Sequence, residues 1–99
     1  MKLTDSEIGI IESCLWTMLR KNYLGSEFAT RLGATENEVQ ALALRVRNSL
    51  ENITPLNKRI VGAVLNEFVN GLNIGNAWPD LFNFTREEAR GLLDRWAAK

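Results

Sequence analysis

Residues 26–42, SEFATRLGATENEVQAL, divide into two helices joined by a sharp turn. Ser26 is placed to cap the first helix, and Gly33 ends it, because glycine adopts the left-handed conformation after a helix C-terminus at little cost. Thr35 and Glu38 then form a capping box, in which each side chain satisfies a backbone N–H group at the start of the second helix. The stretch therefore predicts two consecutive helices that meet at a tight turn.

The same signals recur on both sides of this stretch. Further capping boxes stand at Thr4 with Glu7 and at Thr85 with Glu88, and a Thr cap followed by Pro stands at residues 54–55. These starts predict helices over residues 4–21, 26–33, 36–50, 55–73, 78–82 and from 85 almost to 99. The longer helices each carry an apolar face at helical spacing. The sequence predicts an all-α fold of six helices.

The helix predicted over residues 55–73 is the most apolar of the six. Its inward positions are Ile60, Val61, Val64, Leu65, Phe68 and Leu72. Each fully buried side chain of this size stabilises the fold by about 1.5–3 kcal/mol. We therefore expect this helix at the centre, packed against the helix over residues 4–21.

The second half of the chain resembles the first. Leu3, Gly9 and Leu19 align with Leu56, Gly62 and Leu72 at an offset of 53, and Gly25, Thr35, Glu38 and Leu42 align with Gly75, Thr85, Glu88 and Leu92 at an offset of 50. Caps, glycines and core positions agree together, which favours two tandem three-helix repeats over residues 3–50 and 54–98. The alternative is that amphipathic helices with similar caps resemble one another. With only residues 51–54 between the repeats, we expect one compact domain over residues 1–99.

Residues 26–42 resemble the helix-turn-helix of bacterial and phage regulators. The resemblance lies in a small residue at Ala29, a turn glycine at Gly33, and inward Val39 and Leu42. A worn second copy spans residues 76–92, with Pro79 in place of the small residue and Asn83 in place of the turn glycine. The resemblance implies a helix-turn-helix-like fold and a regulatory protein that contacts DNA or a DNA-associated complex through the second helix of the motif.

Five side chains are candidates for contacting nucleic acid. Asn37 and Gln40 could hydrogen-bond adenine and Arg47 could meet a phosphate, while Arg86 and Arg90 are two outward arginines one turn apart on the second copy. The alternative for this arginine pair is that it forms ion pairs with Glu87 and Asp94 on a solvated helix.

Other features favour a protein partner instead. Twelve basic residues balance twelve acidic ones, so the chain lacks the positive field of strongly basic DNA-binding domains. Trp16, Arg20 and Leu44 lie off the apolar faces and are candidates for a protein interface. The alternative function is an adaptor or inhibitor that docks on a regulator, toxin or phage-defence protein without touching DNA. A homodimer stays open.

Catalysis and cofactor chemistry are not expected. The chain has no histidine, no phosphate-binding glycine loop and no metal-ligand spacing, and capping explains most of its carboxylates. The single cysteine, Cys14, lies among apolar neighbours and is expected to be a small buried residue in a reducing, cytoplasmic setting. No secretory signal or membrane-spanning run is present, so we expect a soluble protein with no membrane or metal partner.

Overall fold

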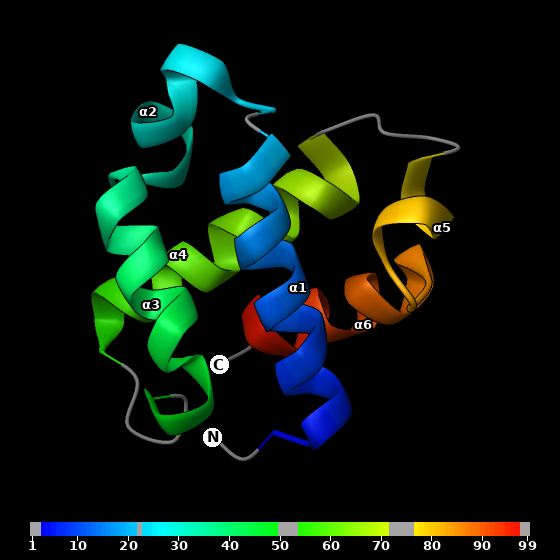
Figure 1. Cartoon of the computed structure of the whole chain (residues 1–99). Coiled ribbons are helices and arrows are strands. Elements are labelled where there is room, and N and C mark those ends of the chain that lie inside the picture. The colour runs from blue at the N-terminus through cyan, green and yellow to red at the C-terminus, as the bar shows by residue number, and fades with distance from the viewer. Residues whose placement is uncertain (1–2, 22, 50–53, 72–76, 98–99) are drawn as a thin grey trace.

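Helices joined by short turns make up the described part of the structure (Figure 1). The computed structural model describes residues 3–21, 23–49, 54–71 and 77–97. The α-helices are α1 (Asp5–Lys21), α2 (Phe28–Leu32), α3 (Glu36–Ser49), α4 (Pro55–Asn66), α5 (Trp78–Leu81) and α6 (Arg86–Ala97), with a 3-10 turn η1 (Gly25–Glu27) and a π turn η3 (Glu67–Gly71). The described residues contain no strand, and the predicted all-α class with six α-helices is confirmed.

Side-chain caps set the starts of the longer helices. In the three predicted capping boxes, each Thr Oγ1 accepts from a Glu N–H at 3.1–3.2 Å and each Glu carboxylate accepts from the Thr N–H at 2.9 Å, at Thr4/Glu7, Thr35/Glu38 and Thr85/Glu88. Thr54 caps α4 by accepting from the N–H of Asn57 at 3.1 Å, with Pro55 as first helical residue. These caps confirm the starts predicted from residue spacing.

The start of α2 differs from the prediction. Ser26 lies inside η1 rather than at a cap, and Glu27, which precedes α2, makes no side-chain cap. The 3-10 turn removes the need for one, because main-chain carbonyls of Leu24 and Gly25 already accept the first N–H groups. At the other end of α2, Gly33 has φ +70°, the left-handed conformation expected of it.

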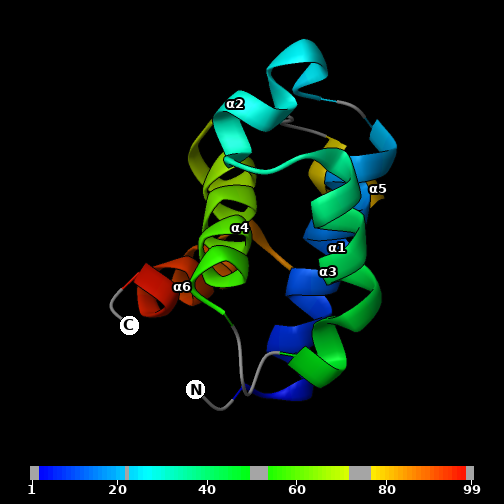
Figure 2. The ribbon, with the colours of Figure 1, turned by 90° about the vertical axis from the view of Figure 1, so that its left-hand side faces the viewer.

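Helix α4 lies at the centre of the fold, as predicted. It packs against α1, α2 and α6, while α3 packs against α1, and Figure 2 shows α1 and α3 together on one side of α4. Five of the inward residues predicted for residues 55–73 form part of the hydrophobic core and are almost completely buried: Ile60, Val61, Val64 and Leu65 in α4, and Phe68 in η3. The sixth, Leu72, lies outside the described residues.

The last described turn of this helix is wound differently from the prediction. A regular α-helix was expected to about residue 73, but residues Glu67–Gly71 form the π turn η3. Two arginines from distant helices bind this turn. Arg31 of α2 donates to the Glu67 carboxylate from Nη2 at 2.7 Å and from Nε at 3.2 Å, and Arg86 of α6 donates to the Val69 carbonyl from Nη2 at 2.6 Å and from Nε at 3.0 Å. A Cβ at Gly71 would overlap the Glu67 carboxylate, so glycine makes room for the ion pair.

Tryptophans fix the second half of the fold. Trp96 of α6 donates to the Lys58 carbonyl at 2.9 Å, and its ring lies 3.3 Å from where a Cβ of Gly62 would stand. Gly62 on α4 thus allows α6 to approach closely. The turn after α5 departs from the first motif, because Phe82 ends α5 in an extended conformation (φ −132°, ψ 149°) where Gly33 is left-handed. The duplication itself stays a prediction.

Candidate functional site

The exposed face of α3 collects three of the candidate residues. Val39, Leu42, Ala43 and Val46 are buried. The opposite side exposes Asn37, Gln40, Ala41 and Leu44, at the spacing of one helical face, and we call these four residues the α3 face. Arg47 also lies in α3, but its side chain falls outside the described part of the structure.

Leu44 is the most unusual member of the α3 face. Its exposed fraction is 68%, and the only other large hydrophobic side chain that is exposed among the described residues is Leu56, at 38%. The neighbours of Leu44 on the preceding turn are the amide of Gln40 and the methyl group of Ala41, and the following turn carries Arg47. An isolated apolar side chain on a surface needs no explanation by itself, but one that follows uncharged side chains along a helical face can enter a pocket on another molecule.

A hollow adjoins the α3 face at the start of the helix. It has a volume of about 480 Å³ and is lined by Gly25, Ser26, Phe28, Ala29, Thr35, Glu36 and Asn37, so it lies between the two helices of the motif. Helix N-termini attract phosphates through free N–H groups. Here the capping box of Thr35 and Glu38 already satisfies the N–H group of each, and the one charged residue of the lining is the acidic Glu36. The hollow is therefore poorly suited to a phosphate.

Intramolecular contacts engage several of the positive charges. Arg86, a candidate for nucleic-acid binding, uses two guanidinium nitrogens on the Val69 carbonyl. Arg31 binds Glu67, and Arg95 binds Glu7. Arg90 is exposed, and among the described residues neither it nor Arg86 forms the ion pairs with Glu87 and Asp94 that the alternative interpretation expected.

The remaining candidates for a protein interface lie on α1. Arg20 is exposed in its last turn. Trp16 is half-buried and packs against the hydrophobic core cluster, so part of its indole already has a structural role. The structure brings Asn37, Gln40 and Leu44 together on one helix but gives no contact that joins Trp16 or Arg20 to them.

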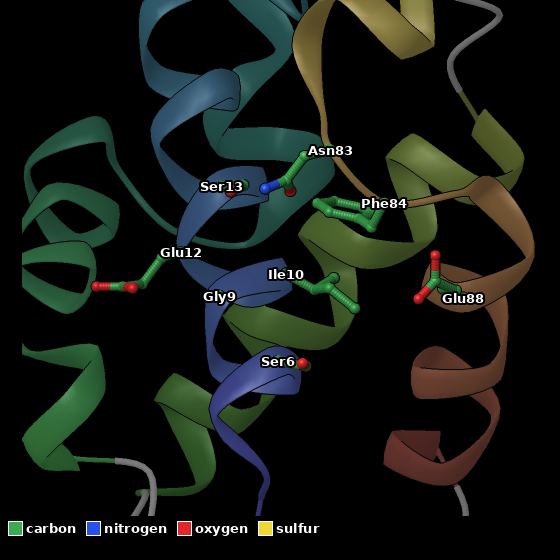
Figure 3. A pocket seen from close by; sticks show the side chains of 8 residues that line it. All are labelled: Ser6, Gly9, Ile10, Glu12, Ser13, Asn83, Phe84 and Glu88. Carbon is green, nitrogen blue, oxygen red and sulfur yellow. The ribbon is translucent and has the colours of Figure 1, made fainter.

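A second hollow, which sequence reasoning missed, lies between α1 and the segment that connects α5 to α6 (Figure 3). Its volume is about 390 Å³, and its lining comprises Ser6, Gly9, Ile10, Glu12, Ser13, Asn83, Phe84 and Glu88. We call it the α1–α6 cleft. Residues from the two ends of the chain form it, so periodicity within one helix could not reveal it.

The Arg31–Glu67 pair was also missed, although the sequence carries a signal for it. Glu67 stands within the apolar arc of α4, three residues after Val64 and seven after Ile60, and only 7% of it is exposed. A carboxylate at such a position must be paired or hydrogen-bonded. The residue that pairs with it, Arg31, is not recognisable from spacing because it lies on another helix.

The Cys14 thiol is buried in the core and is not activated as a nucleophile. Burial raises the pKa of the Cys14 thiol to about 12, so the thiol stays protonated at neutral pH and is a weak nucleophile. No group of three or more His, Cys, Asp or Glu side chains that could hold a metal ion occurs in the described ranges. Within the same ranges, no helix has both the length and the apolarity that crossing a membrane requires.

Comparisons with known proteins assign no function to the α3 face or to the α1–α6 cleft. The chain matches no protein-family model, no curated protein and no solved structure.

Proposed function

We propose that this chain is a small, non-catalytic binding module that acts in regulation by docking its α3 face on another protein. The observation that carries the proposal is Leu44, which is 68% exposed and follows the uncharged Gln40 and Ala41 of the preceding turn on the same face. An exposed leucine is unfavourable in the polar groove of DNA and favourable in an apolar pocket. Burying the exposed part of this side chain would contribute about 1–2 kcal/mol to binding.

Charge also favours a protein partner. The formal net charge is zero, and Arg31, Arg86 and Arg95 are bound within the molecule. Nucleic-acid affinity comes mainly from basic side chains on phosphates. Glu36 at the start of α3 adds a repulsive charge beside the surface that would enter a groove.

The composition of the α3 face indicates the kind of partner. Leu44 would fill an apolar pocket, and the amides of Asn37 and Gln40 would hydrogen-bond polar groups at its rim. These two residues lie seven and four positions before Leu44, which is about 10 and 6 Å along a helix. We therefore expect a partner surface with an apolar pocket and uncharged polar groups within about 10 Å of it. The cytoplasm is the proposed compartment.

The direct test is affinity capture from the native host with two matched variants. Leu44→Glu should abolish capture of a specific partner, because it places a charge in the proposed apolar pocket. Leu56→Glu alters the other exposed leucine, 38% exposed on α4, and should leave capture intact. Equal capture by the wild type and by Leu44→Glu would remove the α3 face as the docking surface.

DNA binding is the second candidate. The observation that favours it is the geometry of α2 and α3, which are joined by only residues 33–35 and expose Asn37 and Gln40 in the first turns of the second helix. Binding to random duplex should then fall steeply as salt rises, and Gln40→Ala should weaken it. Absence of binding at low salt would rule out direct DNA contact. The mass in solution separates both candidates from a self-associating scaffold.

A further inference from the structure

The α1–α6 cleft is built from side chains with complementary properties. In Figure 3, Ser6 and Ser13 lie along α1, Phe84 and Asn83 project toward that helix, and Glu88 stands on the far side, on α6. Hydroxyl, amide and carboxylate oxygens thus surround a partly apolar interior. A Cβ added at Gly9 would meet nothing within 4 Å, so the wall formed by α1 is open there.

The groups opposite α1 are held in place by contacts that need no ligand. The Phe84 ring packs on Phe82 with centroids 4.8 Å apart, and the Phe84 carbonyl accepts a hydrogen bond from Trp78 Nε1 at 2.7 Å. Oε1 of Glu88 accepts from the N–H of Thr85 at 2.9 Å and anchors the carboxylate, while Oε2 takes no part in this capping box. A cleft with fixed walls loses little conformational entropy on binding.

Charge selects the kind of occupant. Among the described residues no lysine or arginine lines the cleft, and the charged side chains of its lining are the carboxylates Glu12 and Glu88. Glu12 has an interaction of its own, and in Figure 3 its side chain is directed away from Phe84, so Glu88 is the carboxylate that a ligand in the cleft would meet. An anion would find no positive charge here, whereas a cation would meet Glu88, the oxygens of the two serines and an aromatic ring.

We propose that the α1–α6 cleft binds an arginine side chain presented by a partner protein. The guanidinium would lie against the Glu88 carboxylate and the ring of Phe84, and the methylene stem would cover Ile10. Arginine fits better than lysine because its planar, weakly hydrated group stacks on aromatic rings and donates several hydrogen bonds in one plane. This contact lies apart from the α3 face and does not depend on it.

The lining also distinguishes a protein-borne arginine from the free amino acid. Free arginine carries a carboxylate, and no described residue of the lining is a basic side chain that could pair with it. Its ammonium group would find no second carboxylate once Glu88 binds the guanidinium. An arginine within a peptide has neither terminal charge. We therefore expect the capped residue to bind at least as tightly as the free one.

The experiment is a titration of the ¹⁵N-labelled full chain followed by amide NMR shifts. The probe is N-acetyl-arginine methylamide, with the citrulline analogue as its neutral isostere and free arginine as a third arm. The capped arginine should give saturable shifts at Ser13, Asn83 and Phe84, and the citrulline analogue should bind about tenfold more weakly or worse.

Matched variants test the role of the carboxylate. Glu88→Gln removes the charge but keeps a side chain that can complete a capping box, so its spectrum reports whether the fold is retained. It should weaken binding of the capped arginine about three- to fivefold, as expected for one partly exposed ion pair. Glu38→Gln makes the same change in the equivalent box of α3 and should leave binding unchanged.

Several results would overturn the proposal. Unsaturable or scattered shifts with the capped arginine would show that the cleft binds no guanidinium, and equal binding of the citrulline analogue would show that charge is irrelevant. Tighter binding of free arginine would assign the cleft to the amino acid instead. Because Leu44 is not altered in any arm, these failures would leave the α3 face untested and would be separate from failure of the docking function.

Discussion

Replacing Arg31 with methionine tests whether the ion pair with Glu67 holds α2 on α4. Arg31 binds both oxygens of a carboxylate whose side chain is only 10% exposed, while the arginine side chain itself is 38% exposed. Methionine keeps the apolar stem of the side chain and removes the guanidinium. The variant therefore leaves a nearly buried carboxylate without its ion-pair partner.

The expected loss of stability follows from this burial. Removing one partner of a fully buried pair costs about 3–5 kcal/mol, and exposed pairs contribute about 0–1 kcal/mol. Since water reaches the arginine side of this pair, we expect Arg31→Met to lower the free energy of unfolding by about 1.5–2.5 kcal/mol. The matched control is Arg95→Met, which breaks the pair with Glu7. Arg95 is 65% exposed, and the Glu7 side chain, 13% exposed, keeps the hydrogen bond from the N–H of Thr4, so this loss should cost about 1 kcal/mol or less.

The assay is urea denaturation of the wild type, of the single variants Arg31→Met, Glu67→Met and Arg95→Met, and of the double variant Arg31→Met/Glu67→Met. The double-mutant cycle isolates the pairwise energy between Arg31 and Glu67. Hydrogen exchange of the backbone amides should also increase more in α2 than in α4 when Arg31 is replaced by methionine. A coupling energy below about 0.5 kcal/mol, or equal losses for Arg31→Met and Arg95→Met, would refute the view that this pair anchors α2.

Further predictions concern individual positions. Cys14 should react with a thiol reagent only at the rate of unfolding, and stability should fall above about pH 9, because the unfolded thiol loses its proton there while burial keeps the folded one protonated up to a pKa of about 12. Gly33→Ala should lower stability in thermal unfolding by about 1 kcal/mol because of its φ of +70°, whereas Gly9→Ala, in a helix with open space around it, should raise it by about 0.5–1 kcal/mol. Arg86→Ala should lower the free energy of unfolding, measured in urea, by about 1 kcal/mol, because its hydrogen bonds to η3 are lost. Arg90→Ala, at an exposed position, should change the free energy of unfolding by less than about 0.5 kcal/mol. Equal effects of the two variants would contradict a stabilising role for the contact between Arg86 and that turn.

Local interactions explain why much of the fold was predictable from sequence. A capping box joins residues three apart, so Thr35 with Glu38 fixes a helix start whatever the rest of the chain does. Apolar periodicity likewise predicted the buried side of α4, and the burial of Ile60, Val64 and Leu65 confirms it. These signals need no knowledge of how the helices are arranged.

Features that depend on distant contacts were not predictable in this way. The π turn η3 is bound by Arg31, 36 residues before Glu67, and by Arg86, 17 residues after Val69. No pattern within one helix predicts contacts between residues so far apart in the sequence. The α1–α6 cleft likewise joins α1 to Phe84, so it exists only once the helices are packed.

The candidate site was predicted in part for the same reason. Helical phase alone placed Asn37, Gln40 and Leu44 on the outside of α3, and the structure exposes all three. Helical phase gives the direction in which a side chain leaves the backbone, but it does not give the position of the functional group at the end of a long side chain. For that reason it treated Arg86 as free to meet DNA, although its guanidinium bends back to the main chain of η3.

Site-specific photo-crosslinking tests the central claim that the α3 face docks on a protein. A photoreactive phenylalanine analogue would be placed at position 44 in one sample and at position 56 in another, and both would be irradiated in cells of the native host. The account predicts one discrete protein adduct from position 44, lost when excess unlabelled chain is present, and none from position 56. Adducts of equal yield from both positions, or recovery of DNA in place of protein at position 44, would contradict it.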